Sequence, residues 1–317
     1  MNTQAFFIVL VSVAGACAQA DWSRERERPT IESSIAEVKI TTGDGFRVIQ
    51  SNGIPDHEPG KFPRRGNPNT MSSQSYNFHI SLEPKVAART TPSRHAWFGV
   101  ALNGVPFEPG TGEFWEGRRE WNFEAMTGHI DLGIDEHHAH VQPGGEYHYH
   151  GLPVGLIQRR GGDEKEMCLV GYAADGFPMY TARGHMDPGD ARSPLKSMRS
   201  SYRLRVGTRP EGIDGSEGPG GRYDGTFTAD YVYQPGSGDL DECNGRFGVT
   251  PEYPAGIYHY YITPEFPYIS RMWRGVPDPS FEKAGRGGPP PRFARRGPPS
   301  DFGFPTDRHG PPPPPLN

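Results

Sequence analysis

Four consecutive residues near the middle of the chain, Tyr147-His148-Tyr149-His150, alternate two types of side chain. This alternation fits a β-strand, in which successive side chains point to opposite faces. Both tyrosines would then share one face and both histidines the other, with the imidazoles about 6–7 Å apart along the backbone. The stretch therefore predicts a strand that presents two histidines side by side, close enough to converge on one ion.

Glycine and proline interrupt the chain at short intervals. It contains 42 glycines and 34 prolines among 317 residues, about twice the ordinary share of the two residues together. Helical periodicity is not sustained, whereas strand-like runs recur at residues 38–50, 76–82, 96–102, 166–174, 201–207 and 226–233. We expect a mainly β fold of internally duplicated β-units in one compact body, with a disordered Pro/Gly-rich C-terminal tail.

The two ends of the chain differ from the middle. Residues 1–20 combine a short apolar run with an Ala-Gln-Ala cleavage site, which predicts a signal peptide and export to the periplasm or the extracellular space. Lipidation at Cys17 is the alternative. Residues 21–35 form a polar leader, and half of residues 284–317 are Gly or Pro, so we expect that tail to be disordered. The domain itself is expected at residues 36–283.

Two sequence patterns recur within this domain. The turn Asn103-Gly104-Val105-Pro106 has a counterpart in Asp175-Gly176-Phe177-Pro178, and both favour a tight turn followed by a fixed exit direction. The segment PGGEYHYHGLP at 143–153 aligns with PAGIYHYYITP at 254–264. We therefore expect two related β-units, at about residues 96–160 and 168–275.

The second unit carries fewer imidazoles than the first. His148 is matched by His259, but Tyr261 stands where the first unit has His150, and Arg246 stands where it has His140. Histidines that served only the fold would be expected in both units alike. The difference predicts a single site, built mainly in the first unit.

Two His-x-His pairs, His138/His140 and His148/His150, flank a turn at residues 142–145. If the turn folds antiparallel, the pairs face each other and three or four nitrogens can close on one ion. We predict a metal site formed by His140, His148 and His150, with His138 and His259 as further candidate ligands. Asp135 and Glu136 are expected to orient the rings as outer carboxylates. An all-nitrogen ligand set favours copper or zinc.

Two other functions remain open from the sequence. A metal-dependent hydrolase or oxidase would need an open coordination position beside His148 and His150. A metal-free extracytoplasmic interaction module would use the Tyr/His strand only for packing. Motifs for nucleotide binding, for a serine nucleophile elbow and for a helical zinc protease site are missing.

Charge and hydropathy limit the partners. The formal net charge of −5 argues against nucleic acid, whose binders are normally basic. The N-terminal apolar run is shorter than the roughly 20 residues of a spanning helix, so we expect no integral membrane segment in the mature chain. A protein partner stays unknown.

Two cysteines remain once the signal peptide is removed, Cys168 and Cys243. In an exported protein they predict a disulfide, which would contribute roughly 4 kcal/mol in the chain-entropy model. A thiolate ligand at Cys243, which aligns with His137, is the alternative.

The combined motifs resemble the YHYH-domain family of exported bacterial proteins. The resemblance rests on SNGIPDH (51–57), GNPN (66–69), WNFEA (121–125), AHVQPGGEYHYHGLP (139–153), YAADGFP (172–178), LDECNG (240–245) and YHYYITPEFPYI (258–269). It covers about residues 36–275 and implies a domain of unestablished activity. The chain departs from the family pattern at Tyr261 and Arg246, where histidine is common, and this weakens any proposal of two equivalent metal sites.

Overall fold

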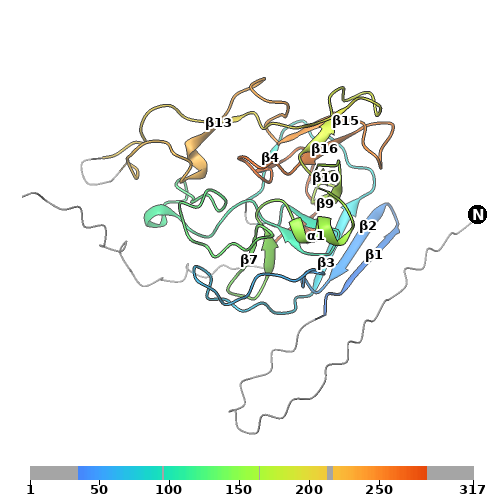
Figure 1. Ribbon diagram of the computed structural model, residues 1–317, viewed down its shortest axis with the longest axis horizontal. Coiled ribbons are helices and arrows are strands. Elements are labelled where there is room, and N and C mark those ends of the chain that lie inside the picture. Colours follow the sequence, from blue (N-terminus) through green and yellow to red (C-terminus); the bar gives the residue numbers. More distant parts are fainter. Residues whose placement is uncertain (1–34, 95, 164, 213–216, 284–317) are drawn as a thin grey trace, which may run out of the picture.

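The computed structural model of the protein describes residues 35–94, 96–163, 165–212 and 217–283 (Figure 1). The predicted signal peptide and C-terminal tail lie outside these residues, as does the leader apart from Ile35. The described chain is mainly β, as the sequence predicts. Among its residues, no helix is long and apolar enough to cross a membrane.

An eight-stranded sheet forms the centre of the molecule. Its strand order is β15-β16-β10-β9-β5-β6-β8-β7, so that β15 and β7 lie at opposite ends (Figure 1). The strands are β5 (Gly99–Ala101), β6 (Pro106–Phe107), β7 (Ala139–Val141), β8 (Tyr147–Tyr149), β9 (Leu169–Ala173), β10 (Pro178–Tyr180), β15 (Gly245–Gly248) and β16 (Ile257–Tyr261). Nearly all residues of the inner strands are buried, which explains their continuous apolar and aromatic composition.

The two halves of this sheet have the same construction. In one half, β5 pairs antiparallel with β6, β6 parallel with β8, and β8 antiparallel with β7. In the other, β9 pairs antiparallel with β10, β10 parallel with β16, and β16 antiparallel with β15. The halves meet where β5 and β9 pair antiparallel. The matching order agrees with the sequence repeats, but common descent of the two halves stays a prediction.

The repeated turns join equivalent strands in the two halves. Gly104, with φ of 80°, lies between β5 and β6, and Gly176, with φ of 92°, lies between β9 and β10. A side chain at Gly104 would collide with Ser51, whose Cβ would lie 2.3 Å from the added carbon. Glycine is therefore required there both for the left-handed backbone and for the space.

A smaller three-stranded sheet packs beside the central one. It consists of β1 (Val38–Gly43), β2 (Phe46–Ser51) and β3 (Tyr76–Ser81), with β2 in the middle. Asp44 and Gly45 form the hairpin turn with φ of 51° and 81°, in the left-handed region that Gly and Asp adopt more readily than most residues. Phe78 of β3 stacks on Phe281 with ring centroids 4.5 Å apart, which ties this sheet to the end of the described chain.

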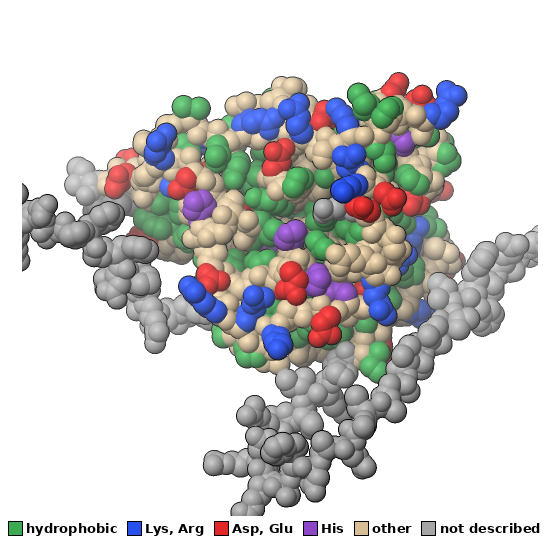
Figure 2. Space-filling model, viewed as in Figure 1, with side chains coloured by type: hydrophobic (Ala, Val, Ile, Leu, Met, Phe, Trp, Pro, Cys, Tyr) green, Lys and Arg blue, Asp and Glu red, His purple; other side chains and the backbone are tan. Residues whose placement is uncertain are grey.

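The remaining elements are short and connect these sheets. They are β4 (Thr91–Pro92), β11 (Arg183–His185), β12 (Leu195–Ser197), β13 (Tyr202–Leu204), β14 (Tyr231–Tyr233), β17 (Met272–Trp273), α1 (Val154–Arg159), and the 3-10 helices η1 (Trp115–Gly117), η2 (Thr228–Asp230) and η3 (Pro279–Phe281). Acidic and basic side chains are interspersed on the face shown in Figure 2.

The predicted disulfide is wrong, because Cys168 and Cys243 are both free thiols. Cys168 directly precedes β9 and Cys243 lies just before β15, and the sheet order places β10 and β16 between those strands. Three strand spacings amount to about 14 Å, well beyond the Cα separation of about 4.4–6.8 Å that a disulfide spans. Cys243 is instead part of the apolar core, and burial raises the pKa of its thiol.

Candidate metal centre

Three histidines meet on one face of the β7–β8 hairpin. The antiparallel register pairs His140 with His148, and His150, just beyond the end of β8, points to the same side. The Nε2 atom of His150 lies 2.9 Å from that of His148 and 3.1 Å from that of His140. His148 and His150 are 1% and 2% exposed, while His140 is partly buried. The three could hold one metal ion, as the sequence predicts.

Backbone carbonyls fix the orientation of two of the rings. His140 Nδ1 lies 2.8 Å from the carbonyl oxygen of Leu132, and His148 Nδ1 lies 3.2 Å from that of Glu146. A carbonyl oxygen only accepts, so in both rings Nδ1 carries the hydrogen and donates it. The Nε2 atoms of both rings therefore carry a free lone pair that points into the cluster.

Burial keeps the three imidazoles neutral. It is the largest cause that lowers the pKa of His140, and it holds the pKa of His148 and of His150 well below the usual value. The neighbouring imidazoles lower the pKa of His148 and His150 further, because a second positive charge would face the first. Neutral imidazole is the form that binds metal.

The opposite face of β8 anchors the strand. Tyr147 donates its phenol hydrogen to Asp135 Oδ2 at 2.8 Å. The Tyr149 phenol oxygen lies 2.8 Å from His57 Nε2 and accepts a hydrogen bond from the Asn103 side chain. The tyrosines therefore fix the twist of β8, and with it the direction of the histidines on the other face.

Asp135 supports the centre differently from the prediction. Besides Tyr147, its carboxylate accepts hydrogen bonds from the backbone N–H groups of Gly60, His137 and Ala139, so it pins the start of β7. Glu136 is exposed. The groups that orient the His140 and His148 rings are the two carbonyls described above, which sequence reasoning cannot identify because every residue has one.

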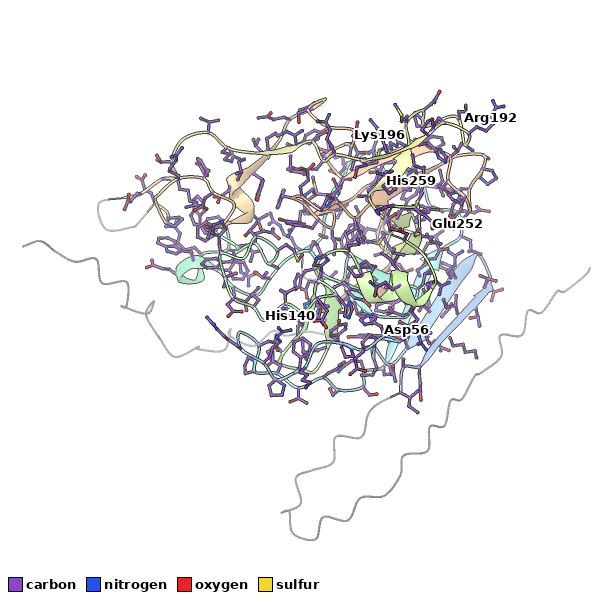
Figure 3. All side chains as sticks on the ribbon, viewed as in Figure 1. Asp56, His140, Arg192, Lys196, Glu252 and His259 are labelled. Atoms are coloured by element: carbon purple, nitrogen blue, oxygen red, sulfur yellow. The ribbon has the colours of Figure 1, made fainter. Side chains whose placement is uncertain are left out.

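The two further candidate ligands lie outside the three-histidine group. His138 adopts a left-handed backbone with φ of 59°, and its Nδ1 lies 2.9 Å from the Leu152 carbonyl oxygen. His259 lies in the other half of the sheet, well apart from His140 in Figure 3. Its Nε2 lies 2.7 Å from the phenol oxygen of Tyr261.

A carboxylate that the sequence did not reveal lies beside the cluster. Glu108 directly follows β6, and its Oε2 atom lies 3.5 Å from His148 Nε2 and accepts a hydrogen bond from the Gln142 side chain. Its other oxygen is paired with Lys283, whose ammonium lies 3.9 Å from the centroid of the Trp97 ring. The only sequence signal was the position of Glu108 after the Asn-Gly-Val-Pro turn.

The second half of the sheet holds a different set at the equivalent place. There, Arg246 pairs with His259 across the β15–β16 hairpin, as His140 pairs with His148. Arg246 donates a hydrogen bond from Nε to the Tyr261 phenol oxygen at 3.3 Å and another to the His185 carbonyl. Arginine thus supplies a permanent positive charge in this half.

Comparison with known proteins identifies the family. No curated protein and no solved structure gives a significant match. The family described as YHYH protein matches residues 77–275, which include both halves of the central sheet and all three clustered histidines. The chain therefore belongs to the YHYH protein family.

Proposed function

We propose that the protein binds one divalent metal ion, copper or zinc, through the Nε2 atoms of His140, His148 and His150. The observation that carries this proposal is the convergence of the three Nε2 atoms, at separations of 2.9 and 3.1 Å, in a buried position. Because residues 1–20 have the pattern of a signal peptide, we further propose that the protein works after export, in the periplasm or outside the cell.

The three Nε2 atoms of the cluster have too few hydrogens among them to pair all of their lone pairs, which favours a bound cation. With Nδ1 of His140 and His148 protonated, their Nε2 atoms both face His150 Nε2. A neutral His150 has only one N–H, and its Nδ1 is buried without a hydrogen-bond partner. Either two lone pairs face a single hydrogen or three lone pairs face one another. A metal ion in the middle satisfies all three nitrogens at once.

The spacing of the nitrogens also suits a metal. Zinc–nitrogen bonds of about 2.0–2.1 Å in a tetrahedral arrangement put ligand nitrogens about 3.3 Å apart. The observed separations are within a few tenths of an ångström of this value. Imidazole ligands suit zinc and copper, and the order of divalent affinities favours Cu(II).

The second half of the sheet supports the same conclusion. Arg246, the counterpart of His140, brings a guanidinium to the ring of Tyr261, at 5.7 Å from the ring centroid. The polar cluster of that half therefore contains a cation, whereas the three clustered rings of the first half are all uncharged imidazoles.

A metal-dependent hydrolase or oxidase is a second candidate. Three histidines leave one position of a tetrahedral ion to water or substrate, which is the arrangement of catalytic zinc sites. A metal-free interaction module is the third candidate. It predicts that thermal stability is unchanged by a chelator and by added metal.

Elemental analysis of protein purified without added metal tests the proposal. We expect near-stoichiometric copper or zinc in the native protein and its loss from the His148→Ala/His150→Ala variant. His185→Ala, which removes a histidine outside the cluster, is the matched control and should keep the metal. Absence of metal together with no affinity at micromolar concentration would overturn the proposal.

A further inference from the structure

Two of the three histidines of the proposed metal centre are almost fully buried, and the third, His140, is partly exposed. His148 and His150 are 1% and 2% exposed. The side chain of Glu108 is 18% exposed and lies against His148. Glu108 is therefore a carboxyl group that reaches both solvent and one ligand of the proposed centre.

Lys283 holds the carboxylate of Glu108 in this position. The Lys283 side chain is 23% exposed, and its ammonium is paired with Glu108 Oε1 while it lies over the Trp97 ring. Trp97 in turn lies 5.8 Å from His148, measured between ring centroids, and its backbone N–H donates to the Phe281 carbonyl. The end of the described chain is thus held against Glu108 and Trp97, both of which lie beside His148.

A groove on the surface leads to Lys283. It has a volume of about 440 Å³, and its lining includes Arg94, Trp273, Asp278, Glu282 and Lys283. Two of these residues, Asp278 and Glu282, are acidic, and two, Arg94 and Lys283, are basic, and Lys283 pairs with Glu108.

We propose that Glu108 is the entry ligand of the metal centre, which takes a divalent cation at the Lys283 end of the groove and transfers it to His148. This inference rests on the proposed function. The arriving ion displaces the Lys283 ammonium from Oε1 and the Gln142 amide from Oε2, and it then exchanges the carboxylate for the imidazole of His148. Glu108 lies outside the group formed by the three histidines, which fits a transient ligand better than a permanent one.

A transient ligand has a kinetic signature. It lowers the barrier for the ion in both directions, so its removal slows uptake and release together and leaves the equilibrium affinity nearly unchanged. A permanent ligand behaves differently, since its removal weakens affinity mainly through faster release.

Zinc kinetics on the full-length protein test this role. Uptake is followed by stopped flow with a fluorescent zinc indicator, release by mixing with excess EDTA, and Kd by equilibrium competition. We expect Glu108→Gln to slow uptake and release about tenfold each, with Kd within about threefold of the wild type. Glu83→Gln removes an exposed carboxylate that does not line the groove and should leave both rates unchanged.

A second variant keeps the test decisive if Glu108→Gln does not fold. Lys283→Met removes the competing ammonium but keeps a side chain over Trp97, so uptake should become about threefold faster. Unchanged uptake in both variants would overturn the inference, as would a tenfold weaker Kd with normal uptake in Glu108→Gln. Failure of the wild type to bind zinc or copper would instead overturn the proposed function itself.

Discussion

His148 Nε2 and His150 Nε2 lie 2.9 Å apart on one face of the chain. Tyr149, the residue between them, points to the opposite face, where its phenol oxygen lies 2.8 Å from His57 Nε2. One short strand therefore has two separate tasks. Its tyrosines bind to the body of the protein, and its histidines are left to meet His140. The hydrogen bonds of Tyr147 and Tyr149 hold β8 in the position that brings the three uncharged rings together.

Loss of the Asp135 carboxylate should destabilise the protein. Asp135→Ala removes the acceptor of the Tyr147 phenol and of three backbone N–H groups. Hydrogen bonds to a charged group contribute about 1.5–3 kcal/mol each, and we expect a loss of about 3 kcal/mol or more in the free energy of unfolding. Urea denaturation of the variant and the wild type measures this difference in the free energy of unfolding. Glu136→Ala, at the neighbouring exposed position, should change stability by less than about 0.5 kcal/mol.

The folding stability of the protein without bound metal should begin to fall at pH values well above those at which ordinary carboxylates take up protons. Burial lowers the pKa of His259 to about 4, from the usual value of about 6.5 for a histidine. Because the unfolded chain takes up the proton first, the stability present above pH 6.5 falls as the pH drops from 6.5 to 4, by about 1.4 kcal/mol per pH unit for this one group.

Urea denaturation at pH 7.5, 6 and 5 checks this slope. His148 and His150, whose pKa values are also lowered, add to it in the same direction. The variant His259→Gln should have a shallower slope than the wild type. Equal slopes for the two proteins would show that His259 is not buried as an uncharged ring.

Two substitutions should give the second half of the sheet a metal site. Arg246→His together with Tyr261→His reproduces, around His259, the register of His140, His148 and His150. We expect the bound metal to rise from about one to about two ions per chain, measured by elemental analysis. Arg246→His alone supplies only two imidazoles and serves as the control. A double variant that folds and keeps one ion would show that the two halves are not equivalent.

The thiols of Cys168 and Cys243 should be free. Alkylation with iodoacetamide in denaturant, without a reducing agent, is expected to modify both residues, as read by peptide mass spectrometry. Without denaturant, Cys243 should react far more slowly because its side chain is buried. A disulfide-linked peptide would contradict the strand order described above.

The sequence predicted the parts of the structure that depend on local pattern. Alternation along Tyr147–His150 gave the strand and its two faces, and the hairpin at residues 142–145 gave the pairing of His140 with His148. The recurrent strand-like runs, without sustained helical periodicity, predicted the mainly β fold class. These predictions succeeded because a period of two and a tight turn leave few alternatives.

What the sequence missed depends on distant parts of the chain. Glu108 reaches His148 only because β6 pairs with β8, and Lys283 reaches Glu108 from a segment 175 residues further on. The disulfide prediction failed for the same reason, since the order of strands in the sheet separates Cys168 from Cys243. Pairings of this kind are set by the whole fold.

An anomalous difference map from a crystal of the zinc- or copper-loaded protein tests the central claim most directly. We expect one peak at about 2.0–2.1 Å from the Nε2 atoms of His140, His148 and His150, and no such peak in crystals of His148→Ala/His150→Ala. Three rings in their present positions without a peak between them, at saturating metal, would contradict a metal centre in this protein.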